Sequence, residues 1–454
     1  MVTPALNQSE IFCLFPDENP GLSLLYSPLA GNAVLADNPL ITRAEQLCLN
    51  HPGSPVTDET LRPLLDFIPV KERNPIASNP AQLSSLTILP NEICNLNCSY
   101  CYAAAGRSKQ RLDREVLLGA IRHFISIHGQ NNRHLYISFG GGGEPFLSWE
   151  LIKESVEVAS DLSDKLGIET GFSFATNGTL LNREMLSLIR KYQIKANVSF
   201  DILPDVQQAQ RGRYEEVSRN LHRMTAAGIS PTINAVITPL NVHRQEEMAI
   251  ALISNFPDIR RASFDFVVDA GLFADPVALG AFLNDYYRYF VRARVVAKAA
   301  GVEISSIELA KAASLRARGC SGSLALTAEG KYSICFVVSS PASPLYSEFI
   351  IGQAGTEGKA LIDQDLFRHH LDDNVLENQK CHSCFAKWHC GGGCHFRNCT
   401  YSDAHLEEVC RITRKMVKRG LLENAESQIH NLYGKSLTEL NPEEVSGMLI
   451  KMNG

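Results

Sequence analysis

The chain has 454 residues, of which 45% are hydrophobic and 20% charged, and its net charge is −6. This composition is typical of a globular protein, and the length predicts more than one domain. The negative charge gives no electrostatic case for a nucleic-acid partner, and no apolar run approaches the roughly 20 residues of a membrane helix. The first residues lack the basic start and apolar core of a secretory signal, so we expect a cytoplasmic protein without a membrane partner.

Residues 1–86 predict a small α+β module at the start of the chain. Short strands are expected at residues 11–15 and 31–37, around a turn rich in Pro and Gly. Two helical patterns follow, at residues 41–49 and 57–67. The polar stretch after them is expected to be a linker.

Residues 87–310 alternate between apolar, β-branched runs and amphipathic helical patterns. We predict strands at residues 86–90, 134–139, 171–176, 196–201, 232–237 and 263–268, and helices at residues 114–125, 150–162, 183–192, 214–224 and 244–253. Repeated strand–helix units indicate an α/β fold in which a parallel sheet curls into a partial (β/α)6 TIM-like barrel. In such folds the chemistry lies at the carboxyl ends of the strands.

Residues 311–415 lose this periodicity and are rich in Cys, Gly and turn residues, whereas residues 416–454 read as helical. Bound clusters would supply the cross-links that a loop-rich, iron–sulfur C-terminal domain needs. The chain has thirteen cysteines, which are Cys13, Cys48, Cys94, Cys98, Cys101, Cys320, Cys335, Cys381, Cys384, Cys390, Cys394, Cys399 and Cys410. Disulfides suit small secreted domains, whereas tight cysteine groups in a chain without an export signal favour metal.

The first tight group is Cys94, Cys98 and Cys101, directly after the first barrel strand. Cysteine thiolate is the standard ligand of a [4Fe–4S] cluster, and three thiolates leave the fourth iron open to substrate. A zinc knuckle or a structural cluster is the alternative. Structural zinc sites use four ligands, and the sequence offers no nearby His or fourth Cys.

Three further motifs follow the next three strands. The four glycines before Glu144 let a backbone approach a ligand closely, and the Gly-Lys-Ser/Thr of a phosphate loop is missing. Asn177 begins an Asn-Gly pair, which is by itself also a common turn. Ser199 and Asp201 end the fourth strand and Arg211 follows, although Asp201 could merely cap a helix.

The spacing C-x3-C-x-aromatic-C after the first strand, with these motifs in order, resembles the radical S-adenosylmethionine (SAM) superfamily. The resemblance implies that the open iron binds SAM and that the reduced cluster cleaves SAM to a 5′-deoxyadenosyl radical. Glu144 would bind the SAM amino group, and Tyr100 would lie against the adenine. The implied SAM contacts are Tyr100, Gly142, Gly143, Glu144, Asn177, Ser199, Asp201 and Arg211. The family's glycine after Asp201 is Ile202 here.

The later cysteines, in the order C…G-x4-C…C-x2-C-x5-C-x3-C…C, resemble the SPASM domain of radical SAM enzymes that modify peptides and proteins. The resemblance implies two auxiliary [4Fe–4S] clusters, hence three clusters in all. One would be held by Cys320, Cys335 and Cys394, and the other by Cys381, Cys384, Cys390 and Cys410. Ser314 stands where relatives have a further ligand to the first of these, so that cluster has an open iron or a ligand from elsewhere. Cys399 reads as a spare thiol or as that ligand.

Peptide-modifying relatives often carry an N-terminal module that binds the leader of a precursor peptide as an added strand. Residues 1–86 have a suitable size for that role, and a plain structural extension is the alternative. Anaerobic sulfatase-maturating enzymes place an Asp after the cysteine corresponding to Cys335, where Phe336 stands here. Asp265 and Asp269 are the acids expected within reach of the barrel mouth as catalytic groups, and both could equally be solvated or capping.

We therefore expect a radical SAM peptide maturase, an oxidoreductase-type enzyme that abstracts hydrogen from a ribosomally made peptide and leaves a cross-link or another oxidative change. Its partners would be the precursor peptide and an electron donor such as flavodoxin or ferredoxin. A sulfatase-maturating or small-molecule radical SAM enzyme is one alternative, and a non-enzymatic iron–sulfur scaffold or redox sensor is another. The Gly-Gly-Glu and Asn-Gly motifs count against a scaffold, which has no need of SAM.

Overall fold

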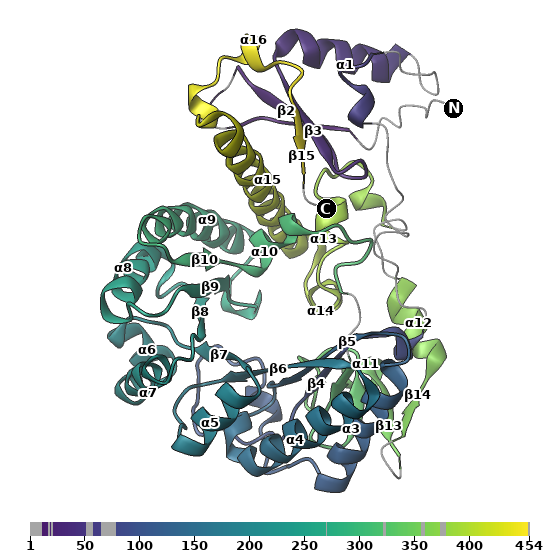
Figure 1. Ribbon diagram of the computed structural model, residues 1–454, viewed down its shortest axis with the longest axis vertical. Coiled ribbons are helices and arrows are strands. Elements are labelled where there is room, and N and C mark those ends of the chain that lie inside the picture. The colour runs from purple at the N-terminus through teal and green to yellow at the C-terminus, as the bar shows by residue number, and fades with distance from the viewer. Residues whose placement is uncertain are drawn as a thin grey trace.

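A computed structural model describes most of the chain and arranges it around two sheets (Figure 1). The residues described are 11–16, 19, 21–50, 58–64, 79–268, 270–320, 324–355, 359–372 and 378–452. Within them, an eleven-stranded sheet has the order β10-β9-β8-β7-β6-β5-β4-β11-β12-β13-β14, and a four-stranded sheet has the order β1-β2-β3-β15.

The larger sheet contains the predicted barrel strands. They are β4 (Ser85–Ile88), β5 (His134–Phe139), β6 (Glu169–Thr176), β7 (Lys195–Ser199), β8 (Thr232–Ile237) and β9 (Arg261–Phe266), and the short β10 (Glu303–Ser305) extends the row. Each pairs in parallel with the next, and the row curves into an open arc in Figure 1. The predicted α/β class with a partial barrel is confirmed.

Amphipathic helices cover the outside of the arc. They are α3 (Arg114–His128), α4 (Trp149–Leu166), α5 (Arg183–Lys191), α6 (Pro204–Gln210), α7 (Tyr214–Ala226), α8 (Gln245–Asn255) and α9 (Pro276–Ala299). Side chains of Asp113, Asn182 and Asp275 accept hydrogen bonds from the first free N–H groups of α3, α5 and α9, which fixes where these helices begin. The helices bury their apolar faces against the strands in one large core.

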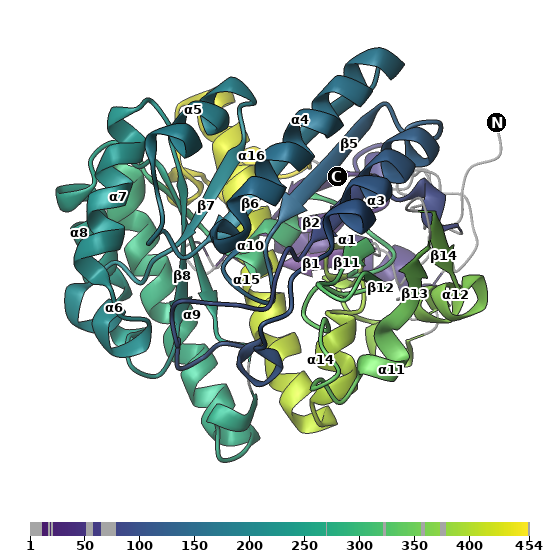
Figure 2. The same cartoon turned by 90° about the horizontal axis from the view of Figure 1, so that it is seen from below.

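The cysteine-rich region continues the barrel sheet. Strand β11 (Leu324–Leu326) pairs in parallel with β4, and β12 (Lys331–Ser333), β13 (Ile350–Ala354) and β14 (Ala360–Ile362) follow as antiparallel strands. Short helices α11 (Tyr346–Phe349), α12 (Gln364–Asp372), α13 (Lys387–Cys390) and α14 (His395–Thr400) accompany them. Figure 2 shows this region beside the open side of the arc, where α15 (Asp403–Tyr433) crosses behind it.

The smaller sheet joins the two ends of the described chain. Strands β1 (Phe12–Leu14), β2 (Ser23–Ser27) and β3 (Asn32–Ala36) form an antiparallel meander, which α1 (Asn38–Asn50) follows. Strand β15 (Leu449–Lys451) pairs antiparallel with β3 and completes the sheet. The helical pattern expected for residues 416–454 therefore holds only to the end of α15. After it, α16 (Pro442–Val445) is a single helical turn, and residues Leu449–Lys451 form β15 and not a helix. For these residues, pairing with the distant strand β3 outweighs local helix propensity.

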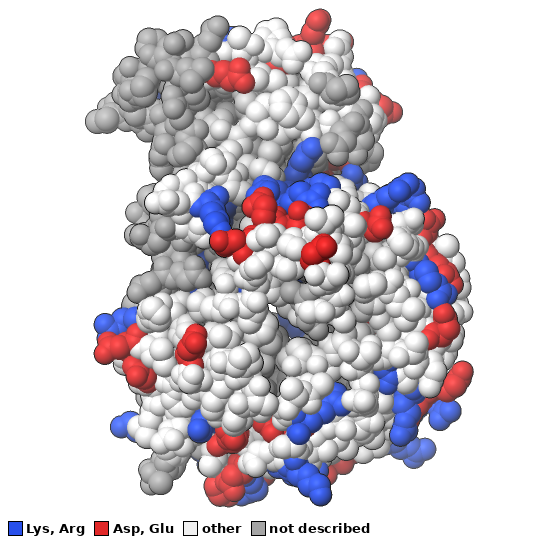
Figure 3. Space-filling model, turned by 180° about the vertical axis from the view of Figure 1, so that it is seen from behind, with Lys and Arg blue, Asp and Glu red and all other residues white. Residues whose placement is uncertain are grey.

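The molecular surface carries charges of both signs. Figure 3 shows Lys and Arg interspersed with Asp and Glu over the described part of one face. Among the described residues, no helix is both long and apolar enough to cross a membrane.

Candidate active site

The sequence motifs meet at one edge of the barrel sheet, where the carboxyl ends of the strands lie. The loop with Cys94, Cys98 and Cys101 follows β4, and the glycine run follows β5. Asn177 follows β6, and Asp201 follows Ser199 at the end of β7. Parallel strands with this order place all four loops side by side, as the sequence predicts.

The three cysteines of the first loop lie close together, and a cation lies beside them. Burial raises the pKa of Cys98, Arg211 opposes this, and the neighbouring Cys101 and Cys94 sulfurs raise the pKa further. The Arg107 guanidinium donates a hydrogen bond to Cys101 Sγ at 3.3 Å. Three crowded thiols become thiolates at neutral pH when a metal supplies positive charge, so this donor set fits an iron–sulfur cluster.

The glycine run is fastened to the segment just before Cys94. The backbone N–H of Gly143 donates to the Asn91 carbonyl, and that of Glu144 donates to the Ile93 carbonyl at 2.7 Å. A Cβ at Gly143 would lie 2.1 Å from the Ile93 carbonyl oxygen, so only glycine allows this approach. Gly143 therefore serves first to set the position of the cysteine loop.

The buried side chain of Glu144, in the loop after β5, is hydrogen-bonded to the end of β6. Its side chain is 2% exposed and accepts hydrogen bonds from the backbone of Phe146 (3.1 Å) and Asn177 (2.7 Å) and from Thr176 Oγ1 (2.6 Å). Burial raises its pKa, and these three donors oppose the rise. The carboxylate thus uses about half of its acceptor sites on the β6 end and a third site on the segment that follows it.

Tyr100, Asp201 and Arg211 form one hydrogen-bonded chain. The Tyr100 hydroxyl donates to Asp201 Oδ2 at 2.8 Å and accepts from Arg211 Nη1 at 2.7 Å. Burial alone would lower the pKa of Arg211, but the Tyr100 oxygen and the Asp201 carboxylate outweigh it and raise the pKa. Arg211 Nε is buried without a hydrogen-bond partner in the described structure, which leaves one donor of this cation for an anionic group such as a carboxylate.

Ile202 takes the backbone conformation that its position demands. Its φ is +67°, in the left-handed region where a β-branched residue is strained, and its side chain is fully buried. The radical SAM resemblance has glycine here, and glycine adopts this conformation freely. The loop after β7 therefore has a positive φ at the position where the resemblance expects glycine.

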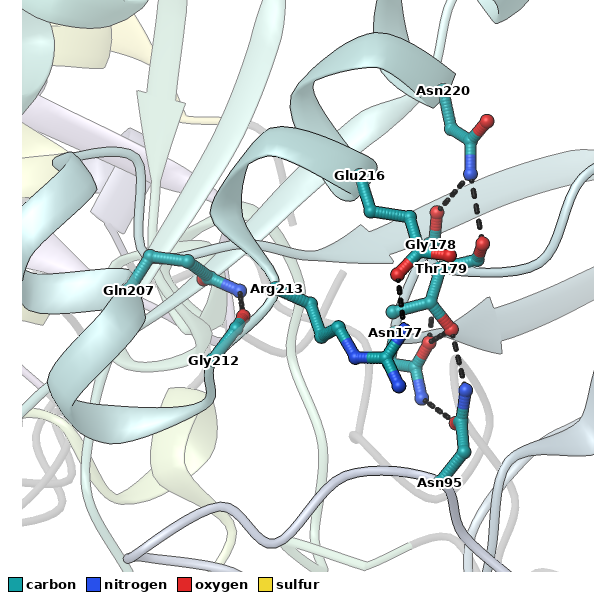
Figure 4. A network of polar contacts seen from close by, with 9 residues as sticks. All are labelled: Asn95, Asn177, Gly178, Thr179, Gln207, Gly212, Arg213, Glu216 and Asn220. Atoms are coloured by element: carbon teal, nitrogen blue, oxygen red, sulfur yellow. Dashed lines mark hydrogen bonds and ion pairs between the residues drawn. The ribbon is translucent and has the colours of Figure 1, made fainter.

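Asn177 ties the end of β6 to the cysteine loop. Its Nδ2 donates to Asn95 Oδ1 at 2.8 Å and lies 4.0 Å from Cys94 Sγ, and its Oδ1 accepts from Thr179. Figure 4 shows Asn220 reaching from α7 to the carbonyls of Gly178 and Thr179. Asn177 is thus an anchor for the loop that holds Cys94.

Several of the later cysteines lie near one another, although among the described residues no three Cys, His, Asp or Glu side chains are arranged as metal ligands, so the two cluster-binding sets stay a prediction. Burial, with the Cys320 and Cys394 sulfurs, raises the pKa of Cys335 to about 12. Cys381, Cys384, Cys390 and Cys410 line one cavity of 280 Å³, which Cys394 also borders. No disulfide joins the cysteines that the structure describes. The fit to clusters rests on this donor chemistry, which is that of iron–sulfur ligands.

Close backbone packing brings Cys320 and Cys394 together. Gly391 begins the glycine run before Cys394, and a Cβ there would lie 2.3 Å from the Arg318 carbonyl carbon. The Gly319 N–H donates to the Gly391 carbonyl. Ser314, where the resemblance expects a further ligand, instead accepts at its hydroxyl from Arg316.

The two acids predicted at the barrel mouth have different outcomes. Asp265 lies in β9, where Oδ1 accepts from the Ile307 N–H at 2.7 Å and Oδ2 accepts from Ser263 Oγ at 2.5 Å. Oδ1 therefore holds the start of α10 (Ile307–Ala310), and Oδ2 is bound to a neighbour within β9. Asp269 lies outside the described residues.

An aromatic pair joins the first cysteine loop to the auxiliary region. Tyr102 and Phe336, which follow Cys101 and Cys335, meet edge to face with ring centroids 6.2 Å apart. They are 49% and 42% exposed, yet burial raises the pKa of Tyr102. A side chain can be partly exposed and still be surrounded by protein atoms when it lines a hollow inside the molecule.

Sequence reasoning missed the groups that support the motifs. Asn95 lies between the first two cysteines and accepts from Asn177, Tyr102 directly follows Cys101, and Arg107 donates to the Cys101 sulfur. Gln210 donates to Asp201 Oδ2 at 3.0 Å. Of these, Arg107 had some signal, because it is the first cation after Cys101 and a thiolate is a suitable partner, although Lys109 and Arg111 follow closely.

Residues 88–252 match the family model of the Radical SAM superfamily, and these residues form a radical SAM domain. The resemblance found in the sequence is thereby confirmed.

Three relatives share part of the chain. An uncharacterized protein of Methanocaldococcus jannaschii is 28% identical over 180 residues, 38% of this chain and 59% of its own length. The radical SAM cyclopropyl synthase TigE of Paramaledivibacter caminithermalis is 27% identical over 133 residues, covering 26% and 27%. An S-adenosylmethionine-dependent nucleotide dehydratase of Psychrobacter lutiphocae is 28% identical over 169 residues, covering 33% and 54%. The matches thus span less than two thirds of each relative.

Two solved structures share the fold over most of the chain. One is anSMEcpe with bound AdoMet and the Cp18Cys peptide, with a TM-score of 0.59 and 18% identity, covering 77% of this chain and 99% of that one. The other is Streptococcus suis SuiB bound to precursor peptide SuiA, with a TM-score of 0.52 and 17% identity, covering 81% and 85%. At this identity the likeness establishes the fold.

Proposed function

We propose that this chain is a radical SAM maturase that modifies a ribosomally made peptide and holds three [4Fe–4S] clusters. The observation that carries the proposal is the layout of the cysteines. Three cysteines lie at the carboxyl edge of the barrel, and later cysteines line a cavity formed by the cysteine-rich region and α15, which supports two auxiliary sets. A scaffold or sensor would not need the barrel site.

Residues of the barrel would hold the first cluster and SAM. Cys94, Cys98 and Cys101 would bind three irons, and Arg211 would offer its remaining donor to the SAM carboxylate. When bound, the cluster and SAM supply a 5′-deoxyadenosyl radical that abstracts hydrogen from the substrate. Glu144 and Asn177 fix the loops around this site, which keeps the reacting groups in position.

The later groups would hold the auxiliary clusters of a SPASM-like domain. Cys320, Cys335 and Cys394 form one set, and Cys381, Cys384, Cys390 and Cys410 form the other. These clusters would accept the electron that remains when a substrate radical becomes a closed-shell product. Phe336, which packs on Tyr102, stands where sulfatase maturases have their Asp, so a different peptide modification is favoured.

A peptide substrate agrees with the small sheet at the end of the molecule. Strand β15 covers the β3 edge, and among the described residues no strand pairs with the outer edges of β1 and β15, where a peptide strand would add. Both solved structures named above contain peptides. We assign residues 1–86 to precursor binding on this basis.

The cluster content is tested by anaerobic reconstitution with iron and sulfide. Three clusters give about twelve irons per chain, and the Cys94→Ala/Cys98→Ala/Cys101→Ala variant should lose about four of them. Dithionite-reduced wild type should cleave SAM to 5′-deoxyadenosine, and the triple variant should not. About four irons in the wild type would contradict the auxiliary clusters, and intact clusters without SAM cleavage would favour the redox-sensor alternative.

The proposed peptide substrate is tested by shortening the peptide while the enzyme is kept at full length. Removing residues 1–80 is a poor test, because β1–β3 share a core with α15, and Tyr26 contacts His389 in α13 at 2.5 Å. A short peptide encoded beside this gene should change mass with SAM and reductant, at least tenfold faster with its N-terminal half than without it. Equal rates would contradict leader binding. No mass change in any such peptide, with SAM cleavage intact, would favour a small-molecule substrate.

A further inference from the structure

Glu308, at the start of α10, accepts from two buried cations. Its carboxyl group is 2% exposed, and Oε2 accepts from Lys311 Nζ at 2.5 Å and from Thr413 Oγ1 at 2.8 Å. Oε1 accepts from Arg397 Nη1 at 3.0 Å. Two positive charges against one negative charge leave this buried group with a net charge of about +1. The three elements α10, α14 and α15 meet here.

Both cations border the cavity that the cysteines line. Lys311 and Arg397 stand among Cys381, Cys384, Cys390, Cys394 and Cys410 around this space of 280 Å³. Arg397 is 8% exposed, and its Nε has no hydrogen-bond partner in the described structure. A buried donor without a partner is costly, so something that accepts or carries negative charge is expected beside it.

The two cations belong to different cysteine groups. Burial lowers the pKa of Lys311, but Glu308 and then the Cys390 sulfur outweigh it and raise the pKa. Burial likewise lowers the pKa of Arg397, and Glu308 and the Cys394 sulfur raise it. Arg397 lies three residues after Cys394 in α14, and its guanidinium lies 4.9 Å from the centre of the Phe266 ring at the end of β9. Among the sulfurs, that of Cys390 acts on Lys311 and that of Cys394 acts on Arg397, and both cations border the same cavity.

Packing alone gives a weak reason for burying two cations and one carboxylate together. Burying ions costs desolvation energy, and apolar residues of similar volume often stabilise a protein more. A cluster bound by thiolates is negative and gains a further negative charge on reduction. Positive charge nearby favours the reduced form, and net charge and burial are among the factors that set cluster potentials.

We propose that Lys311 and Arg397 set the reduction potentials of the two auxiliary clusters separately, with Glu308 as the residue that positions both. This inference rests on the proposed auxiliary clusters. Lys311 raises the potential of the cluster at Cys381, Cys384, Cys390 and Cys410. Arg397 raises that of the cluster at Cys320, Cys335 and Cys394, on the side facing the barrel. The two potentials together decide which cluster takes the substrate electron first.

The test is an EPR-monitored redox titration of the reconstituted full chain. Lys311→Met and Arg397→Gln are compared with wild type, and Cys381→Ala and Cys335→Ala assign the two auxiliary signals. Lys311→Met should disfavour reduction of its cluster at least tenfold, which is 59 mV for one electron, and should shift the other cluster less. Arg397→Gln should show the reverse pattern. Lys311→Arg should restore the wild-type potential.

Arg294→Met is the matched control, because Arg294 is also paired with a carboxylate, Glu423, at the α9–α15 junction. It should leave both potentials unchanged. If Lys311→Met loses iron, Lys311→Gln replaces it. The inference is wrong if the reduction equilibrium of each auxiliary cluster changes less than threefold from wild type in both test variants. It is also wrong if Arg294→Met shifts the potentials equally. Either result leaves the clusters in place. A wild type without auxiliary clusters overturns the proposed function as well.

Discussion

Replacing Glu144 with alanine should reveal that this carboxylate supports the loop more than it binds SAM. Its side chain accepts three hydrogen bonds from Phe146, Thr176 and Asn177, all buried. Hydrogen bonds to a charged group contribute about 1.5–3 kcal/mol each, and buried donors left unpaired cost a similar amount. Since water can enter the space left behind, we expect a loss of about 3–5 kcal/mol rather than the full sum.

The assay compares thermal unfolding and SAM binding in the same samples. At about 2 °C per kcal/mol for a domain of this size, Glu144→Ala should lower the unfolding midpoint by about 6–10 °C. Thr176→Val removes one of the three bonds and keeps the carboxylate, so it should cost about 1.5–3 kcal/mol. Both variants should weaken SAM binding in proportion to the stability lost. A Glu144→Ala protein with a wild-type midpoint and no SAM binding would refute this reasoning and restore a direct contact.

Three further outcomes follow from other buried groups. Burial, reinforced by nearby His123, lowers the pKa of His128, so His128 stays neutral in the folded protein while the unfolded chain binds a proton below about pH 6.5. The stability contribution should be fully present above that pH and fall by up to about 1.4 kcal/mol per pH unit below it. His128→Gln should therefore flatten the slope of unfolding free energy against pH. At Ile202, glycine should be more stable than alanine by about 1 kcal/mol in denaturant unfolding, because both lose the side chain and only glycine relieves the positive φ. Tyr100→Phe should lower SAM affinity, measured by equilibrium dialysis, by about fivefold to tenfold, since Arg211 and Asp201 lose their shared hydroxyl; unchanged affinity would contradict an organising role for this hydroxyl.

The barrel could be predicted because its strands and helices carry strong local patterns. In the run from His134 to Phe139, buried residues alternate with more exposed ones, and the run includes β-branched and aromatic residues. Helix α5 has a clear apolar face with Asn182 as its cap. The spacing of the cysteines is itself a signal for metal ligands, and the ligand sets derived from it stay predictions. The strand β2 was missed, since all its residues are buried and its short sequence, three apolar or aromatic residues between two serines, shows no alternation.

The remaining differences come from contacts between distant parts of the chain. Residues Leu449–Lys451 become a strand only because β3 offers an edge, and nothing in their own sequence says so. Glu144 and Gly143 lie where the motif places them, but their hydrogen bonds to the β6 end and the segment before Cys94 depend on the folded sheet. Short motifs thus located the site without disclosing what each side chain contacts.

The pairing of β3 with β15 has a consequence for biosynthesis. Val34 and its partner Leu449 are separated by nearly the whole chain, so the β3 edge stays open while the ribosome makes everything between them. At about 5–20 residues per second, the roughly 400 intervening residues take about 20–80 s. Throughout that time an apolar strand edge is exposed to other chains, and such edges invite aggregation. Slow synthesis or a shortage of chaperones should therefore reduce the yield of this protein more than its barrel alone would suggest.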